Sequence, residues 1–161
     1  MKTLLIVDLQ KGFIKEECKD LPGKIREHIL ATNYTHILFS AFINHANSNF
    51  VKLLNWTKLF GPPETDIVSD LQEFVVPHCM FTKSTYSIFK SREFNRYLEN
   101  EHIQQLDVCG IESDGCVLAT AYDGFDLGYE ITILRELMRS TGALNDATES
   151  IIKRNIDRSV K

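Results

Sequence analysis

Three side chains that can do chemistry, Asp8, Lys83 and Cys116, each lie close to the end of an apolar run. A carboxylate can carry a proton, an ammonium group can stabilise an anion, and a thiol can attack a carbonyl carbon. Together they supply the base, the orienting cation and the nucleophile of covalent catalysis. Each also has a plainer interpretation alone: Asp8 as a helix cap or turn former, Lys83 as a solvated side chain, and Cys116 as part of an ordinary turn.

The position of Cys116 predicts a reactive thiol. Only Glu112-Ser113-Asp114-Gly115 separates it from the apolar run QLDVCGI, and helical spacing follows it. A thiol in the first turn of a helix, with Ser113 or Asp114 as the N-cap, feels the positive end of the helix dipole. We therefore expect the pKa of Cys116 to fall from its ordinary value of about 8.5 towards neutrality. A nearby ammonium group would lower that pKa further.

The other cysteines predict no chemistry. Cys79 and Cys109 lie in apolar runs and are expected to be buried, whereas Cys18 follows two glutamates and is expected to be exposed. The sequence has no C-x-x-C pair and no Cys/His cluster with zinc spacing. We therefore expect free thiols and no metal.

Apolar runs and helical patterns alternate along the chain. We predict strands over residues 3–9, 35–43, 80–84, 105–111 and 129–134, and helices starting at residue 22 and over residues 44–56, 91–100, 114–127 and 142–156, with a possible short helix at 70–74. This alternation predicts an α/β fold: a doubly wound, mainly parallel sheet in a Rossmann-like three-layer αβα arrangement, forming a single domain over 1–161. Ligands of such sheets bind at the carboxyl ends of the strands, where the three candidate residues lie.

The composition is that of an ordinary globular protein, with 161 residues, 43% hydrophobic and 25% charged. The net charge of −4 and the lack of any basic tract longer than two residues argue against nucleic acid as a partner. The first apolar run is too short for a signal peptide or a membrane span, so we expect a cytoplasmic protein that does not bind membranes.

Three motifs together resemble the isochorismatase-like cysteine hydrolase superfamily, which includes nicotinamidases and other small amidohydrolases. They are DLQKGF from Asp8, KSTYSIF from Lys83 and GIESDGCVLATAYDGFDLGY from Gly110, and their order and spacing match over roughly residues 3–135. The resemblance implies that Asp8, Lys83 and Cys116 form a catalytic triad without a cofactor. It also implies the same doubly wound fold and frequent assembly into homo-oligomers.

Further site features follow from the same resemblance. It implies a cis peptide between Ile111 and Glu112, and an oxyanion hole made by the amides of Glu112 and Cys116. It places Phe13 in the substrate pocket, and Tyr86 is a second candidate for that pocket. Phe50, Leu53 and Trp56 are expected in the core or a subunit interface.

The sequence departs from the family pattern at two positions. FINHANSNF has one histidine, His45, and no aspartate two residues before it, so the Asp-x-His metal ligands of some nicotinamidases are absent. Glu112 replaces a residue that is usually small and apolar, and its carboxylate could repel acidic substrates or bind a cationic one.

Isochorismatases that cleave a vinyl ether carry glycine in place of the nucleophile, so Cys116 favours the thiol branch. The chain is also short for the family, and the resemblance leaves open whether it lacks a C-terminal strand or lid that other members have.

The sequence thus predicts a cysteine-dependent hydrolase that cleaves the C–N bond of a small amide through a thioester. Two alternatives stay open: a non-catalytic or regulatory protein that binds a small molecule on the same fold, and a hydrolase of a non-amide substrate such as an ester. A dinucleotide-binding oxidoreductase is disfavoured because no G-x-G-x-x-G follows the first strand.

Overall fold

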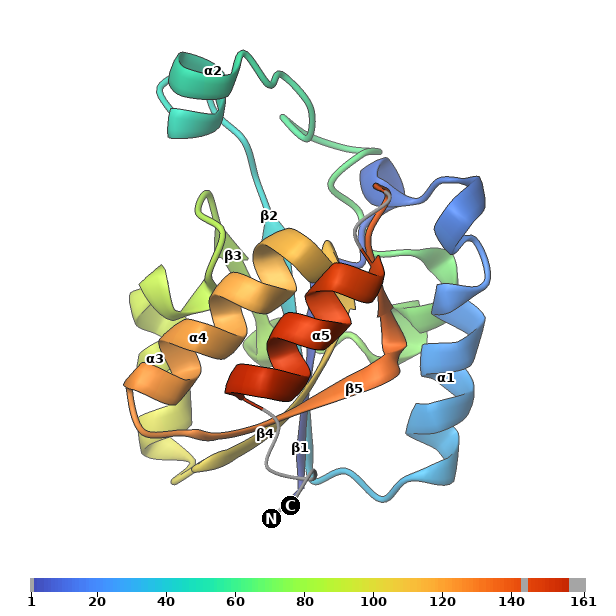
Figure 1. Cartoon of the computed structure of the whole chain (residues 1–161), viewed down its shortest axis with the longest axis vertical. Helices are drawn as coiled ribbons and strands as arrows, with labels where there is room; N and C mark the ends of the chain where they lie inside the picture. The colour runs from blue at the N-terminus through green and yellow to red at the C-terminus, as the bar shows by residue number, and fades with distance from the viewer. Residues whose placement is uncertain (1, 143–144, 157–161) are drawn as a thin grey trace.

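The computed structural model describes residues 2–142 and 145–156. Five strands alternate with helices along the chain (Figure 1). The strands are β1 (Thr3–Val7), β2 (His36–Phe42), β3 (Met80–Lys83), β4 (Gln105–Ile111) and β5 (Glu130–Arg139). The α-helices are α1 (Leu21–Ala31), α2 (Asn49–Leu54), α3 (Arg92–Asn100), α4 (Leu118–Asp126) and α5 (Asn145–Asn155). Short 3-10 turns span Lys11–Phe13, Glu16–Cys18, Ser69–Phe74, Pro77–Cys79 and Ile88–Lys90, and a π-helical turn spans Ser113–Val117.

The strands form one parallel sheet in the order β3-β2-β1-β4-β5. The chain therefore winds outwards from β1 in one direction and then restarts at β4 on its other side. This switch point leaves a crevice at the carboxyl ends of β1 and β4, which is where ligands bind in such sheets. The predicted doubly wound fold is confirmed.

Alternate side chains of β1 enter two separate cores, because successive residues of a strand point to opposite faces. Leu5 and Val7 belong to the cluster that holds residues of α3, α4 and α5. Leu4 and Ile6 belong to the cluster that holds residues of α1 and of the Ser69–Phe74 turn. Burial on both faces explains why the strand reads as an unbroken apolar run.

Gly110 lets β4 approach β1 closely at the crevice. Its φ is +120°, and a Cβ added there would lie 2.2 Å from the carbonyl oxygen of Val7. Any other residue would clash with backbone, so only glycine fits at this point. The close approach brings the segment that carries Cys116 next to the end of β1.

Some local expectations were wrong. Glu112, not Ser113 or Asp114, occupies the N-cap position, and α4 begins only after the π-helical turn. Cys18 was expected to be exposed but is fully buried, whereas Cys79 and Cys109 are buried as predicted. Gly128 has the positive φ of a helix-ending residue.

Helix α2 projects from the body of the molecule (Figure 1). Leu53 on this helix is 75% exposed, so it does not belong to a core. None of the helices in the described part of the chain is long and apolar enough to cross a membrane.

Candidate functional site

Asp8 lies at the end of β1 with its carboxylate in the crevice. Its φ is 50°, a left-handed conformation that aspartate tolerates better than most residues. Ser40 on the neighbouring strand β2 donates a hydrogen bond from Oγ to Asp8 Oδ1 at 2.6 Å and accepts one from the Asp8 amide at 3.2 Å. The carboxylate is fully buried, and its direction is fixed from two sides.

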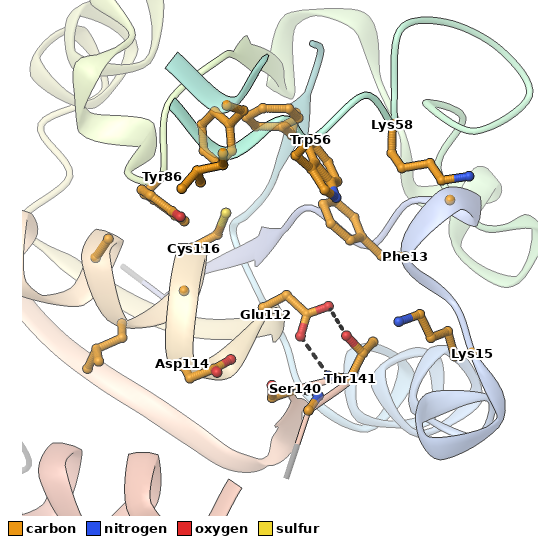
Figure 2. A pocket seen from close by; sticks show the side chains of 18 of the residues that line it. Phe13, Lys15, Trp56, Lys58, Tyr86, Glu112, Asp114, Cys116, Ser140 and Thr141 are labelled. Atoms are coloured by element: carbon orange, nitrogen blue, oxygen red, sulfur yellow. Dashed lines mark hydrogen bonds between the residues drawn. The ribbon is translucent and has the colours of Figure 1, made fainter. Parts of the chain in front are cut away.

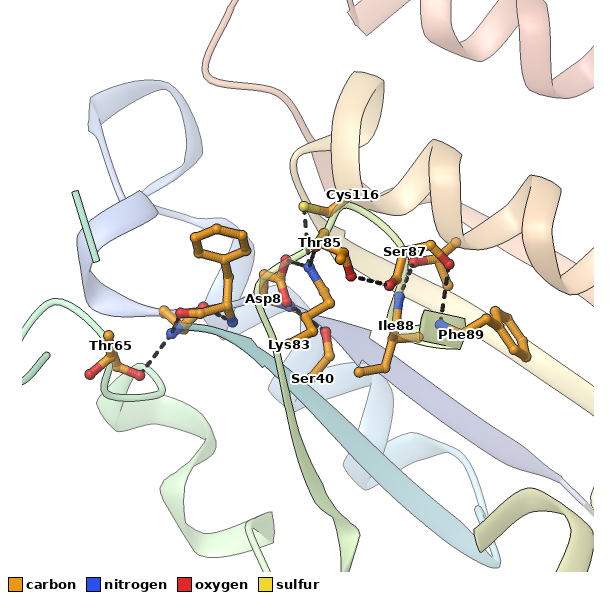
Figure 3. Close-up of polar contacts among 12 residues, drawn as sticks. Asp8, Ser40, Thr65, Lys83, Thr85, Ser87, Ile88, Phe89 and Cys116 are labelled. Atoms are coloured by element: carbon orange, nitrogen blue, oxygen red, sulfur yellow. Dashed lines mark hydrogen bonds and ion pairs between the residues drawn. The ribbon is translucent and has the colours of Figure 1, made fainter. Parts of the chain in front are cut away.

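Lys83 ends β3 and joins the other two candidate residues (Figure 3). Its Nζ donates to Asp8 Oδ2 at 2.5 Å, to the carbonyl oxygen of Thr85 at 2.9 Å and to Cys116 Sγ at 3.4 Å. An ammonium group has three donors, and these three contacts use them all. Phe42 covers the ammonium from 5.3 Å. The tips of Asp8, Lys83 and Cys116 therefore meet at one point in the crevice.

Cys116 lies in the π-helical turn that follows β4. The Ile111–Glu112 peptide is cis, as the resemblance implied. The carbonyl of Glu112 accepts hydrogen bonds from the amides on either side of Cys116, those of Gly115 at 3.1 Å and Val117 at 3.0 Å. Cys116 is 6% exposed and lies on the wall of a cavity.

The electrostatics at Cys116 contradict the expectation of a lowered pKa. Burial raises the pKa of the thiol, and the charge of Asp8 and a hydrogen bond with its carboxylate raise it further. Lys83 lowers it, but the net effect is a pKa well above the ordinary value. Burial alone would lower the pKa of Lys83, yet Asp8 and Cys116 raise it overall. The resting site is therefore an Asp8–Lys83 ion pair beside a protonated thiol.

Cys116 opens into a cavity of about 950 Å³ (Figure 2). Phe13 and Tyr86 line it as expected. Phe50 and Trp56, which were expected in the core or an interface, also line it. The rest of its lining includes Gly12, Lys15, Phe42, Leu54, Lys58, Glu64, Glu112, Asp114, Gly115, Leu118, Ala119, Tyr122, Ser140, Thr141 and Gly142. Aromatic rings thus form much of the wall opposite the backbone turn that holds the thiol.

Glu112 is held by the segment that follows β5. Its two carboxylate oxygens accept hydrogen bonds from the Thr141 amide at 2.6 Å and from Thr141 Oγ1 at 2.7 Å. Figure 2 shows both contacts at the cavity wall. The resemblance offered no reason to expect this partner, because a small apolar residue in place of Glu112 would not make it.

The segment after β2 does not fit the metal-binding arrangement of some family members. Asn44 Nδ2 donates to the carbonyl oxygens of Trp56 and Lys58, both at 3.0 Å. Asn44 Oδ1 accepts from the His45 amide at 2.9 Å and from Ser48 Oγ at 2.6 Å. These contacts tie the side chain to its own loop, and His45 is exposed. Across residues 2–142 and 145–156, no group of three or more His, Cys, Asp or Glu side chains could hold a metal ion.

Two supporting residues were not anticipated from the sequence. Ser40 was hidden inside an apolar strand, where nothing in the pattern marks it as a partner of Asp8. Gln10 is fully buried: its Nε2 donates to the carbonyl oxygens of Phe42 at 3.0 Å and Thr65 at 2.9 Å, and its Oε1 accepts from the Phe42 amide at 2.8 Å. A polar residue two positions after Asp8 could have signalled such a clamp.

Comparison with known proteins agrees with the fold. A curated nicotinamidase from Saccharomyces cerevisiae is 30% identical over 73 residues, which are 43% of this chain and 34% of that protein. The match thus spans about a third of that relative's length. An isochorismatase-like hydrolase from Alkaliphilus metalliredigens superposes with a TM-score of 0.82 at 15% identity, covering 95% of this chain and 91% of the other. An N-carbamoylsarcosine amidase from Thermoplasma acidophilum superposes with a TM-score of 0.80 at 17% identity, covering 97% and 93%. The profile of the isochorismatase domain matches residues 2–154. The chain therefore belongs to the isochorismatase domain family.

Proposed function

We propose that this protein is a cysteine-dependent hydrolase that cleaves the C–N bond of a small amide through a thioester on Cys116. The observation that carries the proposal is the contact of Lys83 with both Asp8 and Cys116 at the wall of a cavity. A nucleophile, a proton carrier and a cation within hydrogen-bonding reach are what this chemistry needs. The names of the two amidase relatives also favour an amide substrate.

The raised pKa of Cys116 sets the order of the steps. The thiol is protonated at rest, so Asp8 takes its proton as the sulfur attacks the substrate carbonyl. The carbonyl oxygen becomes an oxyanion, which the amides of Glu112 and Cys116 stabilise in the arrangement that the family resemblance implies. Asp8 then gives its proton to the leaving nitrogen, the C–N bond breaks, and the C–S bond of the thioester remains.

Hydrolysis of the thioester uses Asp8 in the same two roles, first as a base and then as an acid. Asp8 removes a proton from water as the water attacks the thioester, and it returns that proton to the sulfur when the C–S bond breaks. Lys83 stays charged throughout, because its raised pKa keeps it protonated at neutral pH. Its positive charge stabilises the Asp8 carboxylate and any negative charge that develops on sulfur. The products are a carboxylic acid and ammonia or an amine.

A panel of small primary amides, assayed for ammonia release, tests the proposal. The native chain should release ammonia from at least one amide, and Cys116→Ala should release none. Cleavage of esters without any amide would favour the ester alternative. Binding without turnover of either class would favour the non-catalytic alternative.

A further inference from the structure

We propose that the Glu112 carboxylate makes the cavity select small amides that carry a positive charge next to the scissile carbonyl. This inference rests on the proposed function, because it names the substrate class of the same site. Glu112 lies four residues before Cys116, and both line the cavity. Figure 2 shows Glu112 on the wall between Cys116 and Thr141. A substrate that binds at the thiol therefore shares this cavity with the Glu112 carboxylate.

Thr141 orients the Glu112 carboxylate without occupying all of its hydrogen-bond acceptor sites. It donates one hydrogen bond to each oxygen, from its amide at 2.6 Å and from Oγ1 at 2.7 Å. A carboxylate has about four acceptor sites, so two remain for a ligand. Glu112 is only partly buried, and its negative charge is presented to the cavity from a fixed position.

The aromatic lining favours the same kind of ligand. Phe13 and Trp56 stack with their ring centroids 6.2 Å apart, and Phe50 lies 4.8 Å from Tyr86. The faces of such rings attract cations, and ammonium groups are bound in proteins by aromatic walls of this kind. A carboxylate combined with several aromatic side chains thus complements an organic cation better than a neutral or acidic group.

The other charges of the cavity do not cancel this preference near the thiol. Asp114 adds a second carboxylate to the lining, and the charge of Lys83 is matched by Asp8. Lys15 and Lys58 also line the cavity. Figure 2 shows Lys58 beyond Phe13 and away from Cys116, and Lys15 with its ammonium end toward Glu112 and Thr141. None of the ion pairs in the described part of the chain joins Lys15 to Glu112, so Lys15 does not pair directly with that carboxylate. Lys58 lies 4.0 Å from Glu64, which offsets its charge.

Two amides of matched shape test the inference. Trimethylammonioacetamide carries a quaternary ammonium group on the carbon next to the carbonyl. The neutral compound tert-butylacetamide (3,3-dimethylbutanamide) has carbon in place of that quaternary nitrogen and keeps the same primary amide. Binding of each is measured by calorimetry on the Cys116→Ala variant, so that turnover plays no part. We expect the cation to bind at least about tenfold more tightly, because two unit charges a few ångströms apart near a protein surface attract by more than one decade of affinity. That advantage should shrink as salt is added.

Adding Glu112→Gln to Cys116→Ala separates recognition from structure. We expect the preference for the cation to fall to about twofold or less, with little change for tert-butylacetamide. Glu99→Gln makes the same substitution on the exposed surface of α3 and should leave the preference intact. A purely structural role for Glu112 would instead weaken both amides equally. Three results would overturn the inference: equal weakening of both amides by Glu112→Gln, equal binding of the two amides while Glu112 is unchanged, and no binding of either amide.

Ammonia release by the native chain is measured separately with the same pair. A binding preference without ammonia release from this pair or from any amide of the panel would leave the binding selectivity standing and refute the hydrolase. Release of ammonia without a preference for the cation would refute the selectivity alone.

Discussion

Replacing Asp8 with asparagine should make Cys116 more reactive towards alkylation while abolishing hydrolysis. In the native site the Asp8 carboxylate raises the pKa of the thiol and Lys83 lowers it. Asp8→Asn removes the first effect and leaves the second. The carboxylate and Sγ both lie within hydrogen-bonding reach of the same Nζ, so their separation is at most about 6 Å. At an effective dielectric constant of about 20, two negative charges at that distance repel by roughly 3 kcal/mol.

A change of that size corresponds to about two decades in the population of thiolate. Because relaxation and entering water screen part of it, we expect the rate of alkylation by iodoacetamide at pH 7 to rise at least about tenfold. Labelling is followed on the peptide that contains Cys116 by mass spectrometry. Asp126→Asn makes the same change at an exposed residue near the end of α4 and should have no effect. An Asp8→Asn variant that alkylates no faster, or that still releases ammonia, would refute the assigned role of Asp8.

Three further predictions concern the surroundings of the site. Ser40→Ala removes the donor to Asp8 Oδ1, so kcat should fall about tenfold with little change in KM, since a hydrogen bond to a charged group contributes about 1.5–3 kcal/mol; an unchanged kcat would show that Ser40 does not position Asp8. Gln10→Met leaves buried backbone groups of Phe42 and Thr65 without partners and should lower the free energy of unfolding by about 2–4 kcal/mol in urea titration, whereas a loss below about 1 kcal/mol would contradict the clamp. The free energy of unfolding should fall as pH rises above about 9, because the unfolded chain then loses protons from Cys109 and Cys116 that the folded chain keeps. The free energy of unfolding should fall by about 1.4 kcal/mol per pH unit for each thiol. A melting temperature that does not change from pH 8 to pH 10 would contradict this prediction.

The positions of β1, β2 and β4 could be predicted because burial on both faces makes these strands read as apolar runs. Strand β5 has exposed positions along its length and extends to Arg139, beyond the predicted end at residue 134. The meeting of Asp8, Lys83 and Cys116 followed from the same reasoning, since the carboxyl ends of parallel strands share one edge of the sheet. The cis Ile111–Glu112 peptide followed only from family resemblance. Self-association, which the resemblance also implied, stays a prediction.

The state of Cys116 could not be predicted from its place in the chain. Position at the start of a helix suggested a lowered pKa, but burial and the Asp8 carboxylate have the opposite and larger effect. Both depend on neighbours that are distant in sequence. The same reason explains why the bond from Thr141 to Glu112 and the placing of Trp56 on the cavity wall were missed.

The central claim is that Cys116 forms a covalent acyl intermediate with a small amide. The direct measurement is rapid acid quenching of the native chain during turnover of an amide that releases ammonia, followed by mass spectrometry of the peptide that contains Cys116. The account predicts an added mass equal to the acyl group on Cys116, and neither adduct nor ammonia release with Cys116→Ala. Ammonia release that persists in Cys116→Ala, or a native chain that binds small amides and releases no ammonia from any of them, would contradict it.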